Sequence, residues 1–104
     1  MKKLMTLTTA SIAALALSAG LAQARDLTPE EINQLTGAGT IQSVEQLNQV
    51  VLEQHPGAEI YKAELEQDGN RYVYEVDLKD AQGVKWDLEL DAANGQVLKN
   101  KQDD

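Results

Sequence analysis

Carboxylate side chains are the groups best placed to do chemistry in this chain of 104 residues. Three segments alternate acidic and apolar residues, and such alternation places the acidic side chains of a β-strand on one face of its sheet. Like charges directly opposite each other destabilise a sheet, so this face would favour a basic protein surface or a divalent cation. A solvated acidic face that prevents aggregation is the alternative interpretation. The predicted partner-binding residues are Glu64, Glu66, Glu75, Asp77, Asp87 and Glu89, of which Glu75, Asp77, Asp87 and Glu89 are also weak candidates for metal ligands.

Catalytic groups are scarce in the sequence. The chain has no cysteine, so it has no thiol nucleophile. Its one histidine, His55, precedes a proline that stops a helix, and we expect it to be a helix-end residue. A Ser-His-Asp arrangement would need Ser43, which its neighbours identify as a helix cap. We therefore predict no catalytic residue, and since there is no glycine-rich phosphate loop we predict no cofactor.

The segment Asp91–Gly95, DAANG, shares residue types with a calcium loop but not the spacing. Counted from Asp91, a calcium loop of the EF-hand type needs oxygen ligands at its third and fifth positions and a glutamate at its twelfth. Ala93, Gly95 and Gln102 occupy those positions here. Asn and Gly tolerate the backbone of a tight hairpin, so DAANG is predicted to be a turn between two strands.

The N-terminal segment is typical of a secretory signal peptide. Lys2 and Lys3 precede an apolar run from Leu4 to Leu21, and an Ala-Gln-Ala site follows that run. This pattern predicts a signal peptide at residues 1–24 with cleavage after Ala24. An uncleaved membrane anchor is the alternative. A short, simple signal is typical of bacterial export, so a periplasmic location is expected.

Net charge limits the classes of partner. The chain has 17 acidic and 9 basic residues; without Lys2 and Lys3, 7 basic residues remain and the net charge becomes −10. Such a surface repels nucleic acid and anionic lipid, so we expect no nucleic-acid partner and no membrane association after cleavage. The residues beyond the predicted signal are enough for one small domain.

Two capping boxes predict two helices. Thr28 to Glu31 opens a short helix that ends near Gly37, so that residues 25–40 form this helix and a linker. Ser43 to Gln46 opens a longer helix, which Pro56-Gly57 ends. The apolar residues that would face a sheet from this helix are Val44, Leu47, Val50, Val51 and Leu52.

Four strands with short turns follow the second helix, and the last is expected at Gln96 to Lys99, before a polar tail at residues 101–104. Strict alternation predicts one buried and one solvated face. Ile60 breaks the alternation, so a bulge is expected near it. The fold class is therefore α+β: a short N-terminal helix and a longer helix packed on a four-stranded antiparallel meander sheet. The aromatic residues predicted on the core side are Tyr61, Tyr72, Tyr74 and Trp86.

The order of these motifs resembles the PepSY domain family, and the resemblance covers about residues 40–100, which places a PepSY-like domain at residues 41–100. The residues that carry it are His55-Pro56-Gly57, Ala58-Glu59-Ile60, Ala63-Glu64-Leu65-Glu66, Asp68-Gly69, Tyr72 to Leu78, Trp86 to Asp91 and Asn94 to Leu98.

The resemblance implies a protein that is not an enzyme. PepSY domains occur in the propeptides of thermolysin-like metallopeptidases, in spore-germination proteins and as small exported proteins, and the family is thought to restrain or modulate peptidases. It has no catalytic residues to carry over. We therefore expect a periplasmic protein that binds and modulates another protein, either a peptidase or the sensor domain of an envelope signalling system. Low-affinity binding of divalent cations by the acidic face is the alternative.

Overall fold

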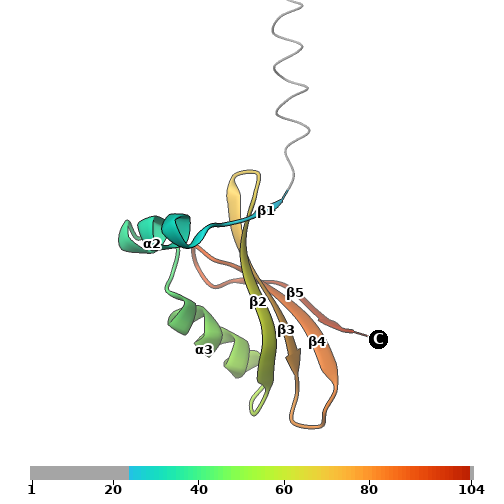
Figure 1. Ribbon diagram of the computed structural model, residues 1–104. Helices are drawn as coiled ribbons and strands as arrows, with labels where there is room; N and C mark the ends of the chain where they lie inside the picture. The colour runs from blue at the N-terminus through green and yellow to red at the C-terminus, as the bar shows by residue number, and fades with distance from the viewer. Residues whose placement is uncertain (1–23, 104) are drawn as a thin grey trace, which may run out of the picture.

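The computed structural model describes residues 24–103, which form two helices on one side of an antiparallel sheet (Figure 1). This arrangement confirms the predicted α+β class. The predicted signal peptide, residues 1–24, lies outside the described residues except for Ala24. Along the described part of the chain, no helix combines the length and the apolar character needed to span a membrane.

Both helices begin at the predicted capping boxes. Helix α2 spans Pro29–Gly37; the Thr28 hydroxyl accepts a hydrogen bond from the Glu31 N–H at 3.2 Å, and the Glu31 carboxylate accepts one from the Thr28 N–H at 3.0 Å. Helix α3 spans Val44–Gln54, and Ser43 and Gln46 form the same reciprocal pair. These bonds satisfy amide groups that the first turn of a helix leaves unpaired. The start of each helix is therefore fixed by its local sequence.

The sheet is a meander in the order β1-β2-β3-β4-β5, with every neighbouring pair antiparallel. The register of β2 with β3 shifts between Ile60 and Lys62, which confirms the predicted bulge. The four longer strands are β2 Glu59–Asp68, β3 Arg71–Lys79, β4 Lys85–Asp91 and β5 Val97–Gln102.

Two parts of the sheet differ from the prediction. The number of strands was wrong, because a fifth strand, β1 at Arg25–Asp26, pairs with Gln67 and Glu66 along the edge of β2. Two residues are too few to show an alternating pattern, and only tertiary pairing makes them a strand. Strand β5 is also longer than predicted, since it continues to Gln102 and its last residues pair with Trp86 to Leu88 of β4.

The core lies between the sheet and the helices. Leu47 and Val51 of α3 are completely buried in one cluster with the central strands. Val44 and Leu52, in contrast, are 40% and 42% exposed, so their predicted places in the buried stripe were wrong. Each residue turns about 100° around a helix axis, which takes Leu52 away from the side that carries Val51. The strand residues that are completely buried are Val76, Leu78, Leu88 and Leu90.

Three of the four aromatic residues lie on the core side, as predicted. Tyr74 is buried and its hydroxyl donates a hydrogen bond to Asn48 Oδ1 of α3 at 2.6 Å. Tyr72 and Trp86 are half-buried against the core. Tyr61 is 48% exposed, so its predicted core position was wrong. The bulge is the reason, because Tyr61 is the extra residue between Ile60 and Lys62 and has no partner in the register with β3.

Asp91–Gly95 forms a turn between β4 and β5, as predicted. Asp91 Oδ1 accepts a hydrogen bond from the Ala93 N–H at 2.9 Å, and the Asp91 carbonyl accepts one from the Gly95 N–H at 2.7 Å. Gly95 has a φ of 77°, and a Cβ atom there would lie 3.2 Å from Oε1 of Gln42. The Asp91 side chain thus closes its own turn.

Candidate functional site: the acidic outer face of the sheet

The face of the sheet turned away from the helices, which we call the outer face, carries all six predicted partner-binding carboxylates. The register aligns Glu64, Glu75 and Glu89 in one row across β2, β3 and β4. Asp77 and Asp87 lie opposite each other in the next row. Glu66 lies opposite Val73, an apolar residue that is buried although it belongs to this face. All six carboxylate residues are half-buried, so their charges are partly desolvated.

Strand β5 supplies a cation to one side of the outer face. Lys99 lies opposite Glu89 in the register. Its Nζ donates a hydrogen bond to Asp87 Oδ2 at 3.0 Å and lies 3.9 Å from Glu89 Oε2. The hydrogen bond to Asp87 and the negative charge of that residue raise the pKa of Lys99. The carboxylates of β4 are therefore partly neutralised within the chain.

Strand β1 makes the other side of the outer face more acidic than predicted. Asp26 lies directly opposite Glu66. One carboxylate oxygen from each of Asp26, Glu64 and Glu66 lies within 4.8 Å of the other two. Lys62 offsets part of this charge through an ion pair with Glu64 at 3.5 Å, but exposed pairs of this kind contribute little.

The pKa values of Glu66 and Glu75 show the electrostatic consequence. Partial burial raises the pKa of both carboxyls, and neighbouring carboxylates raise them further. Among the neighbouring carboxylates, the largest contributions come from Asp26 for Glu66, and from Glu66 and Glu89 for Glu75. None of the residues Asp26, Glu66 and Glu75 forms an ion pair with another residue of the described range. We call these three residues the acidic centre of the outer face.

The four candidate metal ligands do not converge on a common point. Within residues 24–103, the group of three carboxylates that approach within 4.8 Å is the one around Asp26, and it contains none of the four. Asp87 has one buried oxygen, Oδ1, without a hydrogen-bond partner in the described chain, while its Oδ2 accepts from Lys99. The sheet thus sets these side chains side by side in rows: Glu75 with Glu89, and Asp77 with Asp87.

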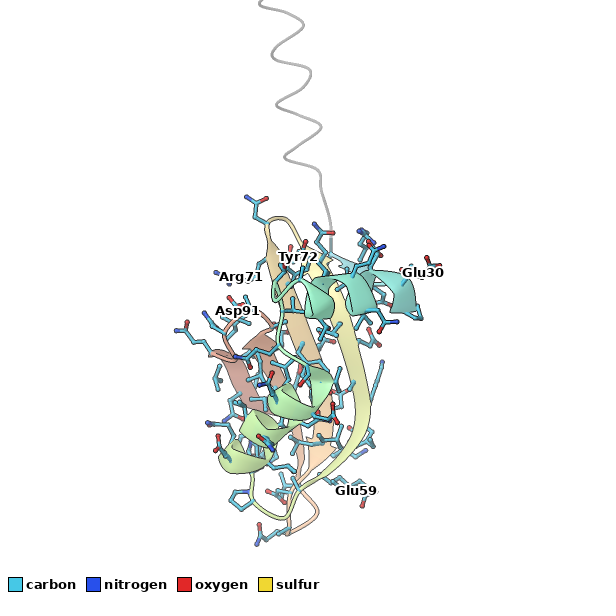
Figure 2. All side chains as sticks on the ribbon, turned by 90° about the vertical axis from the view of Figure 1, so that its left-hand side faces the viewer. Glu30, Glu59, Arg71, Tyr72 and Asp91 are labelled. Atoms are coloured by element: carbon cyan, nitrogen blue, oxygen red, sulfur yellow. The ribbon has the colours of Figure 1, made fainter. Side chains whose placement is uncertain are left out.

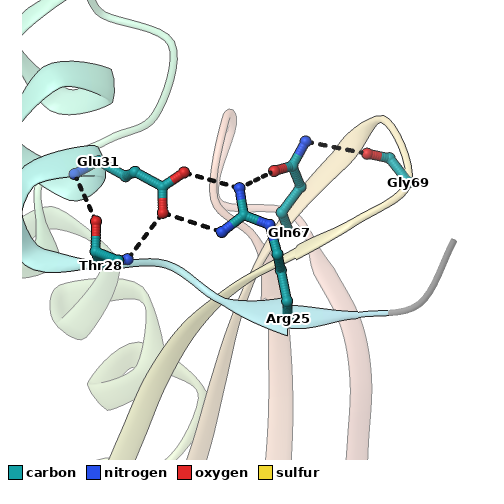
Figure 3. Close-up of polar contacts among 5 residues, drawn as sticks. All are labelled: Arg25, Thr28, Glu31, Gln67 and Gly69. Carbon is teal, nitrogen blue, oxygen red and sulfur yellow. Dashed lines mark hydrogen bonds and ion pairs between the residues drawn. The ribbon is translucent and has the colours of Figure 1, made fainter.

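Arg25 holds β1 in place beside the acidic centre. Its guanidinium donates hydrogen bonds to both carboxylate oxygens of Glu31, at 3.0 and 2.7 Å, and to Gln67 Oε1 at 2.9 Å (Figure 3). The bonds from Arg25 and from the Thr28 N–H lower the pKa of Glu31 to about 2. The arginine therefore links the edge strand to the first turn of α2, and so keeps Asp26 at the edge of β2.

Ser43 caps the start of α3 and His55 stands at its end, as predicted, and His55 also packs on Trp86. His55 directly follows α3, and its ring centroid lies 4.6 Å from that of Trp86 at an interplanar angle of 43°. The Nε2 atom of His55 lies 2.8 Å from Asn100 Oδ1. The Ser43 hydroxyl accepts the hydrogen bond that caps α3. The Ser43 hydroxyl and the Nε2 atom of His55 thus each have a partner within the fold.

Sequence reasoning missed two charged residues of the outer face. Lys99 lies opposite Glu89 only because the register of β4 with β5 shifts between Glu89 and Leu90; pairing outward from Leu90 and Val97 without that shift would place Leu98 there. Asp26 gives no signal either, since its strand has only two residues. Arg25 lies six residues before Glu31, which belongs to the capping box of α2. This spacing is the local indication that an ion pair could attach the segment before α2 to that helix.

Comparisons with known proteins identify the family of the chain. The family model for the PepSY domain, described as "Peptidase propeptide and YPEB domain", matches residues 41–101. The uncharacterized protein YkoJ of Bacillus subtilis (strain 168) is 28% identical over 60 residues, which are 58% of this chain and 35% of YkoJ. The chain thus spans about a third of the length of that relative. No solved structure matches the chain significantly. Domains of this family are generally non-catalytic modules of the propeptide or inhibitor type. Since the family model covers more than half of the sequence, the chain belongs to the PepSY family.

Proposed function

We propose that this PepSY domain binds another protein through its outer face and modulates the activity of that protein, without catalysing a reaction itself. The target is a peptidase or the sensor domain of an envelope signalling system. The domain acts in the periplasm, to which the signal peptide at residues 1–24 directs it.

The observation that carries the proposal is the uncompensated charge of the acidic centre. Glu66 and Glu75 are partly buried carboxyls with raised pKa values and no ion-pair partner among the described residues. A charged group that is partly desolvated gains from a cation brought close to it. A lysine or arginine of a partner would do for Glu75 what Lys99 does for Asp87. A face with such a centre suits a basic protein surface, because electrostatic complementarity sets both encounter rate and orientation.

Membership of the family supports the same conclusion. PepSY domains resemble propeptides, and a propeptide acts by binding a peptidase. A domain that acts on a separate protein must recognise it by surface chemistry. The outer face offers that chemistry, whereas the polar groups of His55 and Ser43 are already engaged.

A capture experiment with two matched variants tests the proposal. The bait is the chain from Arg25, cross-linked in a periplasmic extract of the native host and analysed by mass spectrometry. The test variant, Glu66→Gln, Glu75→Gln and Asp77→Asn, removes three charges from the outer face. The control variant, Glu30→Gln, Glu45→Gln and Glu53→Gln, removes three charges from exposed positions of the helices.

A peptidase or sensor protein retained by the wild type and by the helix variant, but lost with the outer-face variant, supports the proposal. Its purified form should then bind with an affinity that falls as salt rises, because exposed charges are screened. Equal capture by all three baits would contradict binding through this face and would direct attention to the free edge of the sheet. In β2 that edge is open beyond the short stretch paired with β1.

The alternative function is low-affinity binding of a divalent cation. It is supported by the approach of the Asp26, Glu64 and Glu66 oxygens within 4.8 Å of one another. Calcium takes six or more oxygen ligands, so three carboxylates would leave the remainder to water and the affinity low. Calcium should then raise the melting temperature of the wild type more than sodium chloride at equal ionic strength does. The variant Asp26→Asn with Glu66→Gln should lose that difference.

A further inference from the structure

A second feature of the outer face lies at the other end of the sheet. An open surface pocket of about 300 Å³ is lined by Glu59, Tyr61, Lys79 and Lys85, all of them exposed. Glu59 lies at the end of the sheet opposite to Arg71 and Asp91 (Figure 2). We call it the lysine pocket. It shares the outer face with the acidic centre but has the opposite charge at its rim.

The β-bulge forms one wall of the lysine pocket. The register shifts between Ile60 and Lys62, and the residue between them is Tyr61. Its ring is 48% exposed instead of lying in the core with Tyr72 and Tyr74. Bulges often redirect a side chain next to a functional site. The consequence here is an aromatic ring beside two ammonium groups.

The two lysines lie opposite each other in adjacent strands. Lys79 of β3 pairs in register with Lys85 of β4, and like charges at such positions destabilise a sheet. Neither forms an ion pair with any residue between 24 and 103. Glu59 is the register partner of Lys79 on the other side, yet its carboxylate does not form an ion pair with it. The pocket therefore presents two ammonium groups and one carboxylate, none of them in an ion pair, so its net charge is positive.

We propose that the lysine pocket binds a carboxylate group carried on a small apolar body, as in the acidic side chain or the chain terminus of a peptide. The ammonium groups of Lys79 and Lys85 would donate charge-assisted hydrogen bonds to the carboxylate oxygens. The ring of Tyr61 would cover the apolar part, and its hydroxyl offers one more donor. A volume near 300 Å³ is at the lower end of ligand pockets, so one residue-sized group fits.

This inference goes beyond the proposed function and does not depend on it. The acidic centre favours basic residues of a partner, whereas the lysine pocket favours an acidic group. A partner segment that carries a basic residue at one end and an acidic group at the other would bind along the sheet in a single orientation. Small carboxylates test the pocket without any partner protein, so failure of one proposal leaves the other untouched.

The experiment is a titration of the ¹⁵N-labelled chain from Arg25, followed by NMR at constant ionic strength. The first probe is benzoate and its control is benzamide, which has the same ring but no charge. Benzoate should give saturable shifts centred on Tyr61, Lys79 and Lys85, and benzamide should not. The variant Lys79→Gln with Lys85→Gln should weaken benzoate binding about tenfold or more. The matched variant Lys62→Gln with Lys101→Gln, which removes two charges elsewhere on the sheet, should bind like the wild type.

Two further probes identify the source of the carboxylate. N-acetylalanine carries a terminal carboxylate, and N-acetylglutamic acid α-amide carries one on a side chain. Tighter binding of either supports the proposal and names the source. Shifts that do not saturate, equal shifts with benzamide, or unchanged affinity in the Lys79 and Lys85 variant would overturn it. That variant removes a repulsive pair, so it should remain folded, which its melting temperature checks.

Discussion

Asp26 lies directly opposite Glu66, two like charges in register across β1 and β2. Strand β1 contributes only two residues to the sheet, and one of them is repelled by its cross-strand neighbour. The strand is nevertheless in place, because Arg25 is fastened to Glu31 and Gln67 and the Leu27 N–H donates to the Leu65 carbonyl at 2.8 Å. Asp26 is thus held on the outer face by the bonds of its neighbour Arg25, whose side chain binds Glu31 and Gln67 instead of the carboxylates of that face.

The two residues of β1 should therefore have opposite effects on stability. Arg25→Gln removes the bidentate bond to Glu31 and should lower the melting temperature. Asp26→Asn removes the repulsion from Glu66 and should raise it. Thermal unfolding followed by circular dichroism at low ionic strength measures both. High salt should shrink the effect of Asp26→Asn, and a variant Arg25→Gln as stable as the wild type would show that β1 does not depend on the arginine.

Stability should be greatest in mildly acidic solution. The pKa values of Glu66 and Glu75 are raised in the folded protein, so the folded chain binds protons more readily and stability rises as pH falls from neutral towards 4.5, their ordinary pKa. The pKa of Glu31 is lowered to about 2, so its contribution is complete above pH 4.5 and is lost as pH falls through 2. Urea unfolding at about pH 7, 5 and 3 should give the largest free energy of unfolding at the middle value.

Two variants test which carboxyl causes the rise and which causes the fall in the free energy of unfolding as the pH is lowered. Glu75→Gln should reduce the gain between neutral and mildly acidic pH, and Glu31→Gln should reduce the loss at lower pH. A profile that falls steadily from pH 7 downward, with no gain at mild acidity, would contradict the electrostatic description of the acidic centre.

At neutral pH, substitutions of Glu75 and of Lys99 should change the melting temperature in opposite directions. Glu75→Gln should stabilise the fold, because the carboxylate is partly buried among other carboxylates. Lys99→Gln should destabilise it, because Asp87 would lose the donor to Oδ2 while its Oδ1 has no hydrogen-bond partner in the described chain. Melting temperatures of the two single variants and of the double variant measure the coupling. Additive effects would show that Lys99 does not reach the acidic centre electrostatically.

Substituting two leucines of α3 by alanine should separate the effect of packing on stability from that of helix propensity. Leu47 is completely buried, and Leu47→Ala should cost about 2–5 kcal/mol of unfolding free energy through lost transfer energy and the cavity left behind. Leu52 is 42% exposed, and Leu52→Ala should change stability by no more than about 0.5 kcal/mol. Urea unfolding measures both, and comparable losses would mean that Leu52 is covered in solution.

Features set by local sequence could be predicted well. The capping boxes at Thr28 and Ser43, the DAANG turn and the bulge near Ile60 all follow from neighbouring residues, and the structure has each of them. The alternation of acidic and apolar residues also placed the six carboxylates on one face, because the pleat of a strand has a period of two.

Features set by tertiary contact could not be predicted. Strand β1 exists only through its pairing with β2 and the bonds of Arg25. Tyr61 moves to the outer face because the exact residue of a bulge is decided by the pairing of two strands, which alternation in one strand does not give. Charge compensation by Lys99 depends on the register of β5 with β4. The acidic centre therefore lies nearer β1 and β2 than the sequence alone indicated.

The contact between His55 and Trp86 has a practical consequence. Trp86 is the only tryptophan of the chain, it is half-buried, and its Nε1–H donates to Asp80 Oδ2 at 3.0 Å. Its indole thus contacts His55 at the end of α3 and Asp80 in the turn between β3 and β4, and Trp86 directly follows Lys85 in β4. The protein has a fluorescent reporter of its own at the junction of these elements, and unfolding or a rearrangement there can be followed by emission without attaching a dye.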